Sequence, residues 1–416
     1  MLILFLTVLS FRISFAQKLL IPMDLSQSDH LKAYGIAYKI LEQGINVEWL
    51  LNYRGGSFLF DSHSEFEKLC RVRGVNYEVI AAGGEAKIFA TIEENNMETI
   101  MLEKAPKVAV YTPKSKLPWD DAVTLAMTYA EIPYEKIFDE EVLTGKLDDY
   151  DWLHLHHEDF TGQYSKFYAS FANAPWYIEQ QIQSEALAKK LGFSKVSDSK
   201  KAVAKRIKEY VAAGGFMFAM CGATDSFDIA LSADKVDIAG TVYDRDPFDP
   251  NAQKKIDYDK TFAFKDFVVY TDPMQTEFSN IDTTPRNRLF LRGAESDYFS
   301  LFDFSAKYDP VPTMLTQNHT SVVKGFMGLT TAFKKELIKE NVIILGESTP
   351  TNEVKYLHGK FGEGTFTFYG GHDPEDYTHL VGDPPTQLDL HKNSPGYRLI
   401  LNNVLFPAAQ KKPQKT

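Results

Sequence analysis

The stretch Phe216-Met217-Phe218-Ala219-Met220-Cys221-Gly222 decides the fold. Its run of consecutive apolar residues favours a strand that is covered on both faces, as the strands of parallel sheets are. Thr224 and Asp225 follow the glycine and belong to the residue types that begin helices. A cysteine at such a strand-to-helix turn lies at the carboxyl edge of the sheet, where α/β proteins present nucleophiles. The stretch therefore predicts an α/β fold with Cys221 as a candidate catalytic thiol.

A second apolar strand is predicted far downstream, at Phe366–Tyr369, and two glycines and His372 follow it. Thiol catalysis needs a base within hydrogen-bond reach of the sulfur and a third group that orients the base. His372 is the candidate base and Glu375 the candidate orienting acid, with Asp373 and Asp376 as alternatives. The competing interpretation is a structural thiol beside a loop histidine, because cysteine is among the most buried residue types.

Strand and helix signals alternate through the first half of the chain, which is the pattern of a parallel sheet with helices on both faces. We expect a flavodoxin-like, doubly wound, mostly parallel sheet. Asp120 or Asp121 is expected to begin a helix that runs to Ala130. The predicted strands lie at 18–23, 46–52, 77–81, 107–111, 150–156, 215–220, 342–345 and 366–369.

The alternation breaks between residues 234 and 340, a segment rich in Asp, Pro, Phe and Tyr. We interpret 234–340 as an irregular, β-rich insertion, with short strands predicted at 267–270 and 288–291. The α/β core then comprises residues 17–233 and 341–408, followed by a disordered tail at 409–416.

Residues 1–16 resemble a secretory signal peptide. The segment Leu2–Leu9 is apolar but too short to span a bilayer, and Ser14 and Ala16 supply the small residues of a cleavage site. We expect export to the periplasm or the exterior, with Gln17 as the mature N-terminus; a buried first strand is the alternative. No later segment is long and apolar enough to predict a membrane span.

The chain has 45 Lys and Arg residues against 56 Asp and Glu residues, a net charge of −11. This acidic balance argues against nucleic acid as a partner. Two cysteines are too few for a disulfide-stabilised scaffold. With nucleic acid disfavoured, we expect the ligand to be a small molecule, a glycan or a peptide. We expect no cofactor.

A histidine-rich run, Leu153-His154-Leu155-His156-His157-Glu158-Asp159, follows a predicted strand. On a strand His154 and His156 point to the same face, and His157 points to the other. Two histidines on one face beside carboxylates can bind zinc or another divalent metal ion. The alternative is a polar strand end that lines a cleft and contacts substrate.

The run Asn52-Tyr53-Arg54-Gly55-Gly56-Ser57 follows the second predicted strand. An arginine beside a Gly-Gly turn can bind an anion or a carboxylate. Arg54, Gly55 and Gly56 are therefore candidate substrate-binding residues, together with Gly222. The alternative is an ordinary loop, since the run lacks the Lys-Ser/Thr of a phosphate-binding loop.

A strand-end cysteine, followed much later by a strand, a histidine and a Pro-Glu pair, resembles the class I glutamine amidotransferase-like superfamily. The resemblance implies a flavodoxin-like sheet with Cys221 as nucleophile, His372 as base and Glu375 as orienting acid. The chain departs from the family pattern at two points. Ala219 stands where Gly-x-Cys-x-Gly has its first glycine, and Asp373 is inserted into the His-Pro-Glu sequence.

The segments Leu20–Leu25, His30–Gly35 and Leu51–Gly56 resemble exported Bacteroidetes proteins that are commonly labelled asparagine synthetase B. The residues do not support that label. Asparagine synthetases resemble enzymes with a cysteine at the mature N-terminus and a Ser-Gly-Gly-x-Asp loop for ATP. This chain has Gln17 at the expected start and no such loop.

These features predict an exported, amidotransferase-like hydrolase that attacks an amide or an ester through Cys221. Backbone N–H groups of Gly222 and Ala223 would stabilise the oxyanion.

Two alternatives stay open. One is a non-catalytic glycan- or peptide-binding module in the same cleft, with Trp119, Trp152 and Trp176 as contacts. The other is a metal site built on His154 and His156.

Overall fold

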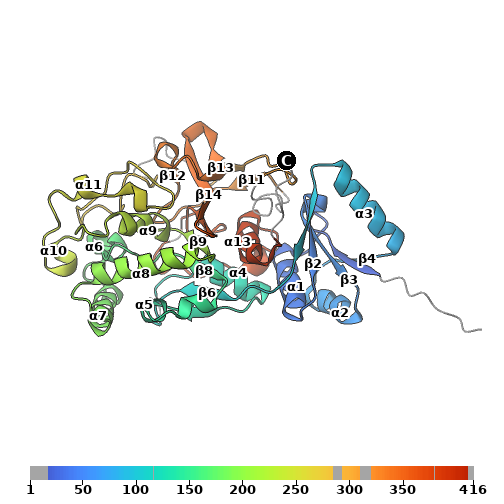
Figure 1. Ribbon diagram of the computed structural model, residues 1–416, viewed down its shortest axis with the longest axis horizontal. Helices are drawn as coiled ribbons and strands as arrows, with labels where there is room; N and C mark the ends of the chain where they lie inside the picture. Colours follow the sequence, from blue (N-terminus) through green and yellow to red (C-terminus); the bar gives the residue numbers. More distant parts are fainter. Residues whose placement is uncertain (1–16, 116, 284–292, 310–319, 379, 411–416) are drawn as a thin grey trace, which may run out of the picture.

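The chain forms a mixed α/β protein with two separate β-sheets (Figure 1). The computed structural model describes residues 17–115, 117–283, 293–309, 320–378 and 380–410. The predicted signal peptide, the short strand at 288–291 and the last six residues of the predicted tail lie outside this part. Within the described ranges no helix combines the length and apolar character that a membrane span requires.

The first sheet is antiparallel throughout and has the strand order β4-β1-β3-β2-β5. Its strands are β1 (Lys18–Ile21), β2 (Val47–Leu51), β3 (Ser57–Asp61), β4 (Glu78–Ile80) and β5 (Glu98–Leu102). The expectation that residues 18–81 contribute strands to one parallel sheet was therefore wrong.

The loop between β2 and β3 explains the error. Parallel neighbours need a crossover connection of a dozen or more residues, whereas an antiparallel hairpin needs only a short turn. Asn52, Arg54, Gly55 and Gly56 all have left-handed backbone angles, so the chain reverses within a few residues and β3 pairs with β2. We did not predict β3 from the sequence.

The second sheet has ten strands within the described residues, in the order β11-β10-β13-β14-β15-β9-β8-β6-β7, with β12 paired to β14. Five strands, β15, β9, β8, β6 and β7, are parallel neighbours. The parallel strands are β6 (Val108–Tyr111), β7 (Glu135–Ile137), β8 (Trp152–Leu155), β9 (Phe216–Met220) and β15 (Gly364–Tyr369). The antiparallel strands are β10 (Tyr298–Leu301), β11 (Val322–Lys324), β12 (Phe333–Lys334), β13 (Ile343–Ser348) and β14 (Glu353–Phe361).

Helices cover both faces of the parallel strands, as the sequence predicted. Met217 and Ala219 share a core with α8 and α9, whereas Phe218 and Met220 face the core that includes α1, α4 and α13. In Figure 1 the latter three helices lie between the two sheets. The helices are α1 (His30–Glu42), α2 (Ser64–Arg73), α3 (Ala82–Glu94), α4 (Ala122–Ala130), α5 (Asp139–Leu143), α6 (Tyr168–Phe171), α7 (Pro175–Lys190), α8 (Val196–Ala212), α9 (Ala223–Ser232), α10 (Thr241–Asp244), α11 (Ala252–Lys255) and α13 (Pro395–Leu405).

A fully buried arginine joins the last helix to the N-terminal sheet. Arg398 on α13 donates hydrogen bonds to the carbonyl oxygen of Met23, at 3.0 Å, and to that of Gly55. Its Nε donates to the hydroxyl of Tyr34 on α1, also at 3.0 Å. Adding a Cβ to Gly55 would bring it within 2.3 Å of the Met23 oxygen, so only glycine fits at this crossing.

Phe218→Asp should prevent folding. Phe218 is inaccessible to solvent in β9, between β8 and β15, and a buried unpaired carboxylate costs several kcal/mol of the roughly 5–15 kcal/mol that stabilise a domain. Soluble expression and circular dichroism measure the result. The control is Phe302→Asp at a 56% exposed position, which should fold. A native-like Phe218→Asp protein would contradict the placement of β9.

His358 on β14 should make folding sensitive to mild acid. Burial lowers its pKa to about 3, and it bonds to the hydroxyl of Thr367 at 2.7 Å. The folded state therefore excludes a proton that the unfolded chain binds below its pKa of about 6.5, so stability falls as the pH drops through that value. Between pH 7 and pH 5 the wild-type protein should lose about 2 kcal/mol more than His358→Leu, measured by urea unfolding. Equal losses would contradict a buried neutral imidazole.

Candidate functional site

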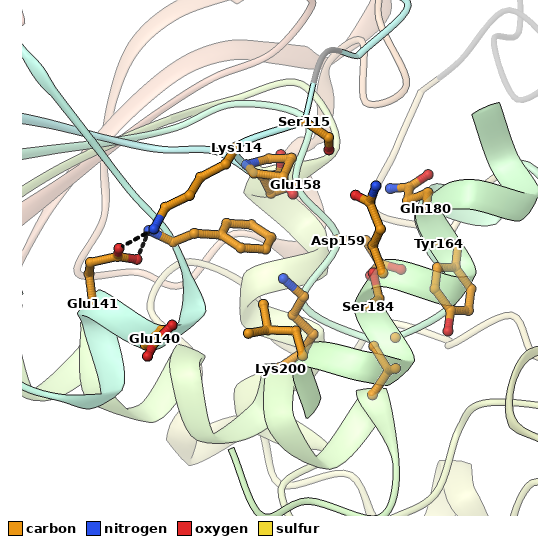
Figure 2. A pocket seen from close by; sticks show the side chains of 16 residues that line it. Lys114, Ser115, Glu140, Glu141, Glu158, Asp159, Tyr164, Gln180, Ser184 and Lys200 are labelled. Atoms are coloured by element: carbon orange, nitrogen blue, oxygen red, sulfur yellow. Dashed lines mark hydrogen bonds and ion pairs between the residues drawn. The ribbon is translucent and has the colours of Figure 1, made fainter. Parts of the chain in front are cut away.

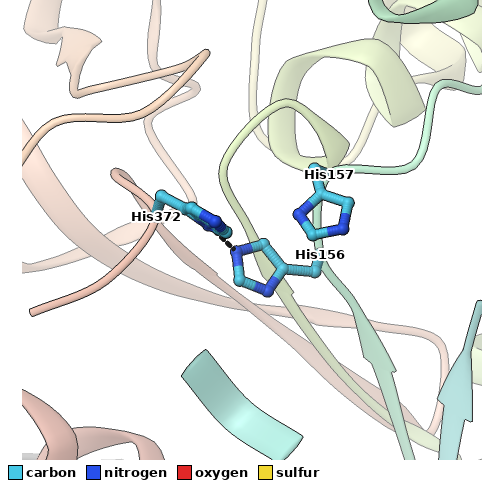
Figure 3. A group of neighbouring side chains, drawn as sticks. All are labelled: His156, His157 and His372. Carbon is cyan, nitrogen blue, oxygen red and sulfur yellow. Dashed lines mark hydrogen bonds between the residues drawn. The ribbon is translucent and has the colours of Figure 1, made fainter. Parts of the chain in front are cut away.

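The carboxyl edge of the parallel strands carries two features that chemistry could use. The first is a cavity of about 210 Å³, lined by residues that follow β6, β7 and β8 and by α7 and α8 (Figure 2). The second is a group of three buried histidines, His156, His157 and His372 (Figure 3). Ligand sites of α/β proteins form at this edge because the connecting loops gather there.

The three histidine rings converge from two strand ends. His156 and His157 follow β8, and His372 follows β15. His156 Nε2 lies 2.7 Å from His372 Nδ1, and one nitrogen from each of the three rings lies within 4.8 Å of the others. The rings pack closely, with centroids of His156 and His157 4.4 Å apart. These are nitrogen atoms of a type, number and spacing that a transition metal ion could bind.

Asp121 fixes the orientation of His156. Its first oxygen accepts a hydrogen bond from the Thr124 N–H at 2.8 Å and so caps α4. Its second oxygen lies 3.1 Å from His156 Nδ1 and 3.1 Å from His154 Nε2. Burial acts to raise the pKa of Asp121, but the two imidazoles outweigh it, and the pKa lies well below the usual value. An ionised carboxylate at Nδ1 leaves Nε2 of His156 directed at His372.

His154 lies in the core, but it also belongs to a second group that could hold a metal ion: one ring nitrogen each of His154 and His156 and one oxygen of Asp121 lie within 4.8 Å of one another, as the alternative of a metal site on His154 and His156 requires. It is inaccessible to solvent and packs against the rings of Trp152 and Phe218, which also stack on each other. Burial lowers its pKa. The prediction that His154 and His156 share a face is confirmed by their common contact with Asp121, yet only His156 reaches the three-histidine cluster.

The acids near His372 differ from the expected ones. Asp120 Oδ1 lies 3.9 Å from His372 Nε2. Glu375, the expected orienting acid, has its carboxylate 3.0 Å from Nδ1 of His391. Asp373 accepts hydrogen bonds from the Glu375 N–H and from the hydroxyl of Tyr397, so it connects this turn to α13.

Cys221 stands at a strained strand-to-helix turn. Its φ of 54° is left-handed, a conformation that costs a non-glycine residue about 1–3 kcal/mol and that is frequent at active sites. Its backbone N–H donates to the carbonyl of Gly371, so the turn lies beside the segment that carries His372. The thiol is buried and accepts a hydrogen bond from the Leu329 N–H at 3.2 Å. Burial raises the pKa of Cys221 to about 11.

The backbone N–H groups of Gly222 and Ala223 were expected to stabilise an oxyanion, and one of them forms a hydrogen bond within the protein. The N–H of Ala223, one of the expected oxyanion donors, donates to the carbonyl of His156 at 2.8 Å in this structure. A Cβ on Gly222 would lie 3.3 Å from the Leu329 side chain, which shows how closely the 326–331 segment covers this turn.

Arg54, Gly55 and Gly56 lie in the other sheet, in the turn between β2 and β3. The Arg54 guanidinium pairs with Asp24 and Glu78, each at 2.7 Å. The arginine therefore binds carboxylates, as its surroundings suggested, but these carboxylates belong to the protein. The structure does not bring these three residues into the histidine cluster.

The loop after β8 is held by one carboxylate. Asp159 accepts hydrogen bonds from the Thr161 N–H and hydroxyl, both at 2.6 Å, and from the Ser165 N–H at 3.1 Å. Tyr164, Ser165 and Lys166 all have left-handed φ angles, of 50°, 55° and 58°. Three successive non-glycine residues in this region mark a loop whose shape is imposed by its contacts.

Sequence reasoning missed His157, Asp120 and Glu158 as site residues. His157 was expected on the opposite face, but β8 ends at Leu155, so the strand alternation no longer applies to it. Glu158 is buried, and burial raises its pKa to about 8. The sequence did carry a signal for these residues, namely the density of His, Glu and Asp directly after a buried strand.

Of the three tryptophans proposed as ligand contacts, Trp152 is buried in the core and therefore cannot contact a ligand in the cleft.

Comparisons with known proteins give only distant similarity. No protein-family model matches the chain, and no curated protein matches it. Among solved structures, cytoplasmic proteins STM3548 and STM1381 from Salmonella typhimurium align over 73% of this chain and 100% of theirs, each at 11% identity, with TM-scores of 0.35 and 0.33. Gan42B, a GH42 beta-galactosidase, aligns over 65% of this chain and 28% of its own at 12% identity, with a TM-score of 0.25. TM-scores of this size carry no conclusion about function.

Iodoacetamide should react slowly with Cys221 in the folded protein. With a pKa of about 11, roughly one molecule in ten thousand carries the thiolate at pH 7, and the thiol is buried. Mass spectrometry of labelled peptides gives the rates. Cys70, also buried and with its pKa raised to about 12, is the internal control, and urea-unfolded protein gives the reference rate. Labelling of Cys221 faster than the unfolded reference, and its loss in His372→Ala, would instead indicate an activated nucleophile.

Proposed function

We propose that His156, His157 and His372 bind a divalent transition metal ion of the zinc class, and that the protein is a metal-dependent hydrolase of amide or ester bonds. One observation carries the proposal: ring nitrogens of three buried histidines converge within 4.8 Å at the carboxyl edge of the parallel strands. Three imidazole ligands leave a coordination position for water, the arrangement of catalytic rather than structural zinc sites. Such an ion lowers the pKa of bound water to about 7 and so supplies a hydroxide nucleophile.

The contacts of His156 fit this role. Zinc-binding histidines donate their second N–H to a carboxylate or a carbonyl, which fixes the tautomer. Asp121 Oδ2 is 3.1 Å from His156 Nδ1, which leaves the Nε2 lone pair toward His372. Ligand nitrogens around a tetrahedral ion are about 3.3 Å apart for bonds of about 2.0–2.1 Å. The 2.7 Å between His156 Nε2 and His372 Nδ1 would have to widen slightly, which needs only a small rotation of the rings.

The second candidate is the hydrolysis through Cys221 that the sequence suggested. The left-handed φ of Cys221 and its hydrogen bond to Gly371 support it, because a strained turn beside a histidine is how class I glutamine amidotransferase-like domains present their nucleophile. The same geometry supports our proposal that the parallel half of the second sheet belongs to that superfamily. The raised pKa and the burial of the thiol favour the metal-bound water as nucleophile.

Metal content tests the proposal. The full chain should retain close to one equivalent of zinc after dialysis, measured by inductively coupled plasma mass spectrometry. His156→Ala and His372→Ala should each lose most of it. Asp121→Asn, which keeps the helix cap but weakens the contact with His156, should bind zinc about 10–100-fold more weakly. Zinc should also increase p-nitrophenyl acetate hydrolysis by the wild-type protein but not by His372→Ala.

The matched control is His391→Ala, because His391 is partly exposed and pairs with Glu375 outside the cluster. It should bind zinc like the wild type. Wild-type protein that binds no zinc, or binding that both cluster variants leave unchanged, contradicts the metal site. Cys221→Ser separates the candidates, because it should keep zinc and zinc-dependent hydrolysis unless the thiol is the nucleophile.

A further inference from the structure

The face of α7 that lines the cavity carries polar side chains. Gln180, Gln183 and Ser184 recur at the i, i+3 and i+4 spacing of one helix face, and all three line the cavity of about 210 Å³ (Figure 2). A helix that only packs against the rest of a protein turns its apolar residues inward. On α7 the apolar Ile178 and Ile182 are instead 43% and 58% exposed. This pattern favours a polar occupant of the cavity.

Two polar groups of the cavity wall are buried and form no hydrogen bond within the described residues. They are the hydroxyl of Tyr164, a side chain that is 4% exposed, and Oε1 of Gln180. The amide oxygen accepts hydrogen bonds, whereas a tyrosine hydroxyl can donate as well as accept. Buried polar groups normally have partners, because an unsatisfied one is costly. A ligand with groups that both donate and accept would satisfy the two together.

The charged pairs of the cavity wall are formed within the protein. Lys114 pairs with Glu141 at 2.8 Å, and Lys200 pairs with Asp139 at 2.9 Å. Glu140 pairs with a lysine of α7 at 2.6 Å. These three pairs leave the wall without need of a charged ligand.

The two acidic residues after His157 also line the cavity. Asp159 accepts three hydrogen bonds from its own loop. Glu158 lies in the field of the Lys200 ammonium group. A ligand of this cavity therefore needs no charge of its own to be held there.

We propose that the cavity binds a small, uncharged, polyhydroxylated molecule with the size of one sugar ring, such as a neutral hexose. Its hydroxyl groups donate to Oε1 of Gln180 and pair with the hydroxyl of Tyr164. Phe138 and Leu187 of the wall offer apolar surface to the C–H face of the ring. The volume of about 210 Å³ is below the roughly 300–1,000 Å³ of pockets for drug-sized ligands, which limits the ligand to about one ring.

The inference is independent of the metal site, because none of the three clustered histidines lines the cavity. Sugar binding should therefore be the same with and without EDTA. Sugar binding that disappears on treatment with EDTA would overturn this independent site.

A panel of neutral sugars tests the ligand class. Saturation-transfer NMR on the full chain at pH 6 should detect binding of at least one of glucose, galactose, mannose and N-acetylglucosamine. Isothermal titration calorimetry should then show that the matching uronic acid and the matching amino sugar bind at least about tenfold more weakly, because each would bury a charge that the wall does not pair. Binding of none of the four sugars, or equally tight binding of a charged form, would overturn the proposal. The methyl glycoside of the sugar that binds distinguishes the end of a glycan, which it should match in affinity, from a free monosaccharide.

Variants with matched controls test the two wall groups. Tyr164→Phe and Gln180→Leu should each weaken sugar binding at least about fivefold. Tyr177→Phe removes another buried hydroxyl without a hydrogen-bond partner, next to Tyr164 but outside the cavity wall. Gln181→Leu removes the neighbouring amide of α7, which does not line the cavity either. Both controls should bind sugar like the wild type, and undiminished binding by both cavity variants would refute the assignment.

Thermal unfolding distinguishes a binding residue from a structural one. Because the Tyr164 hydroxyl has no hydrogen bond to lose within the described protein, Tyr164→Phe without sugar should unfold at the temperature of the wild type. Excess sugar should raise the unfolding temperature of the wild type and raise that of Tyr164→Phe less. A clear fall in the unfolding temperature of sugar-free Tyr164→Phe would show a structural role for the hydroxyl and would count against the proposal.

Discussion

The parallel pairing of β8, β9 and β15 is the constraint on which the candidate site depends. Leu155 and Phe368 both lie opposite Ala219 of β9, so the three strands end level with one another. Two backbone hydrogen bonds continue this alignment beyond the strands, from the N–H of Cys221 to Gly371 and from the N–H of Ala223 to His156. The main chain thus brings together residues that are more than two hundred positions apart in the sequence.

The sequence could predict the interior strand but not every neighbour. A run that is apolar at each position has to be covered on both faces, so Phe216–Met220 identified β9 and its turn without knowledge of the pairing. Alternating strands and helices at the N-terminus did not reveal pairing direction, because that depends on which strands meet after the chain reverses at Gly55. Asp121 was recognised as a candidate helix cap, while the contact of its second oxygen with two histidines depends on the tertiary fold. Export stays a prediction, since residues 1–16 lie outside the described part.

Local strain is concentrated around the same edge of the sheet. Cys221 and the successive residues Tyr164, Ser165 and Lys166 occupy left-handed conformations, each costing about 1–3 kcal/mol. Glu158 adds a buried carboxyl group whose pKa burial raises to about 8. The two large apolar cores on either side of the sheet can offset such costs, which a sequence selected for stability alone would avoid.

The buried Arg398 has a consequence for how the protein is made. Its hydrogen bonds join positions 375 and 343 residues apart, at Met23 and Gly55. A ribosome releases the N-terminal sheet long before α13 exists, so that sheet must wait with its docking face incomplete while almost the whole chain is synthesised. Truncation shortly before Arg398 would leave the two sheets without this connection, and the unfinished face would then be open to chaperones and proteases.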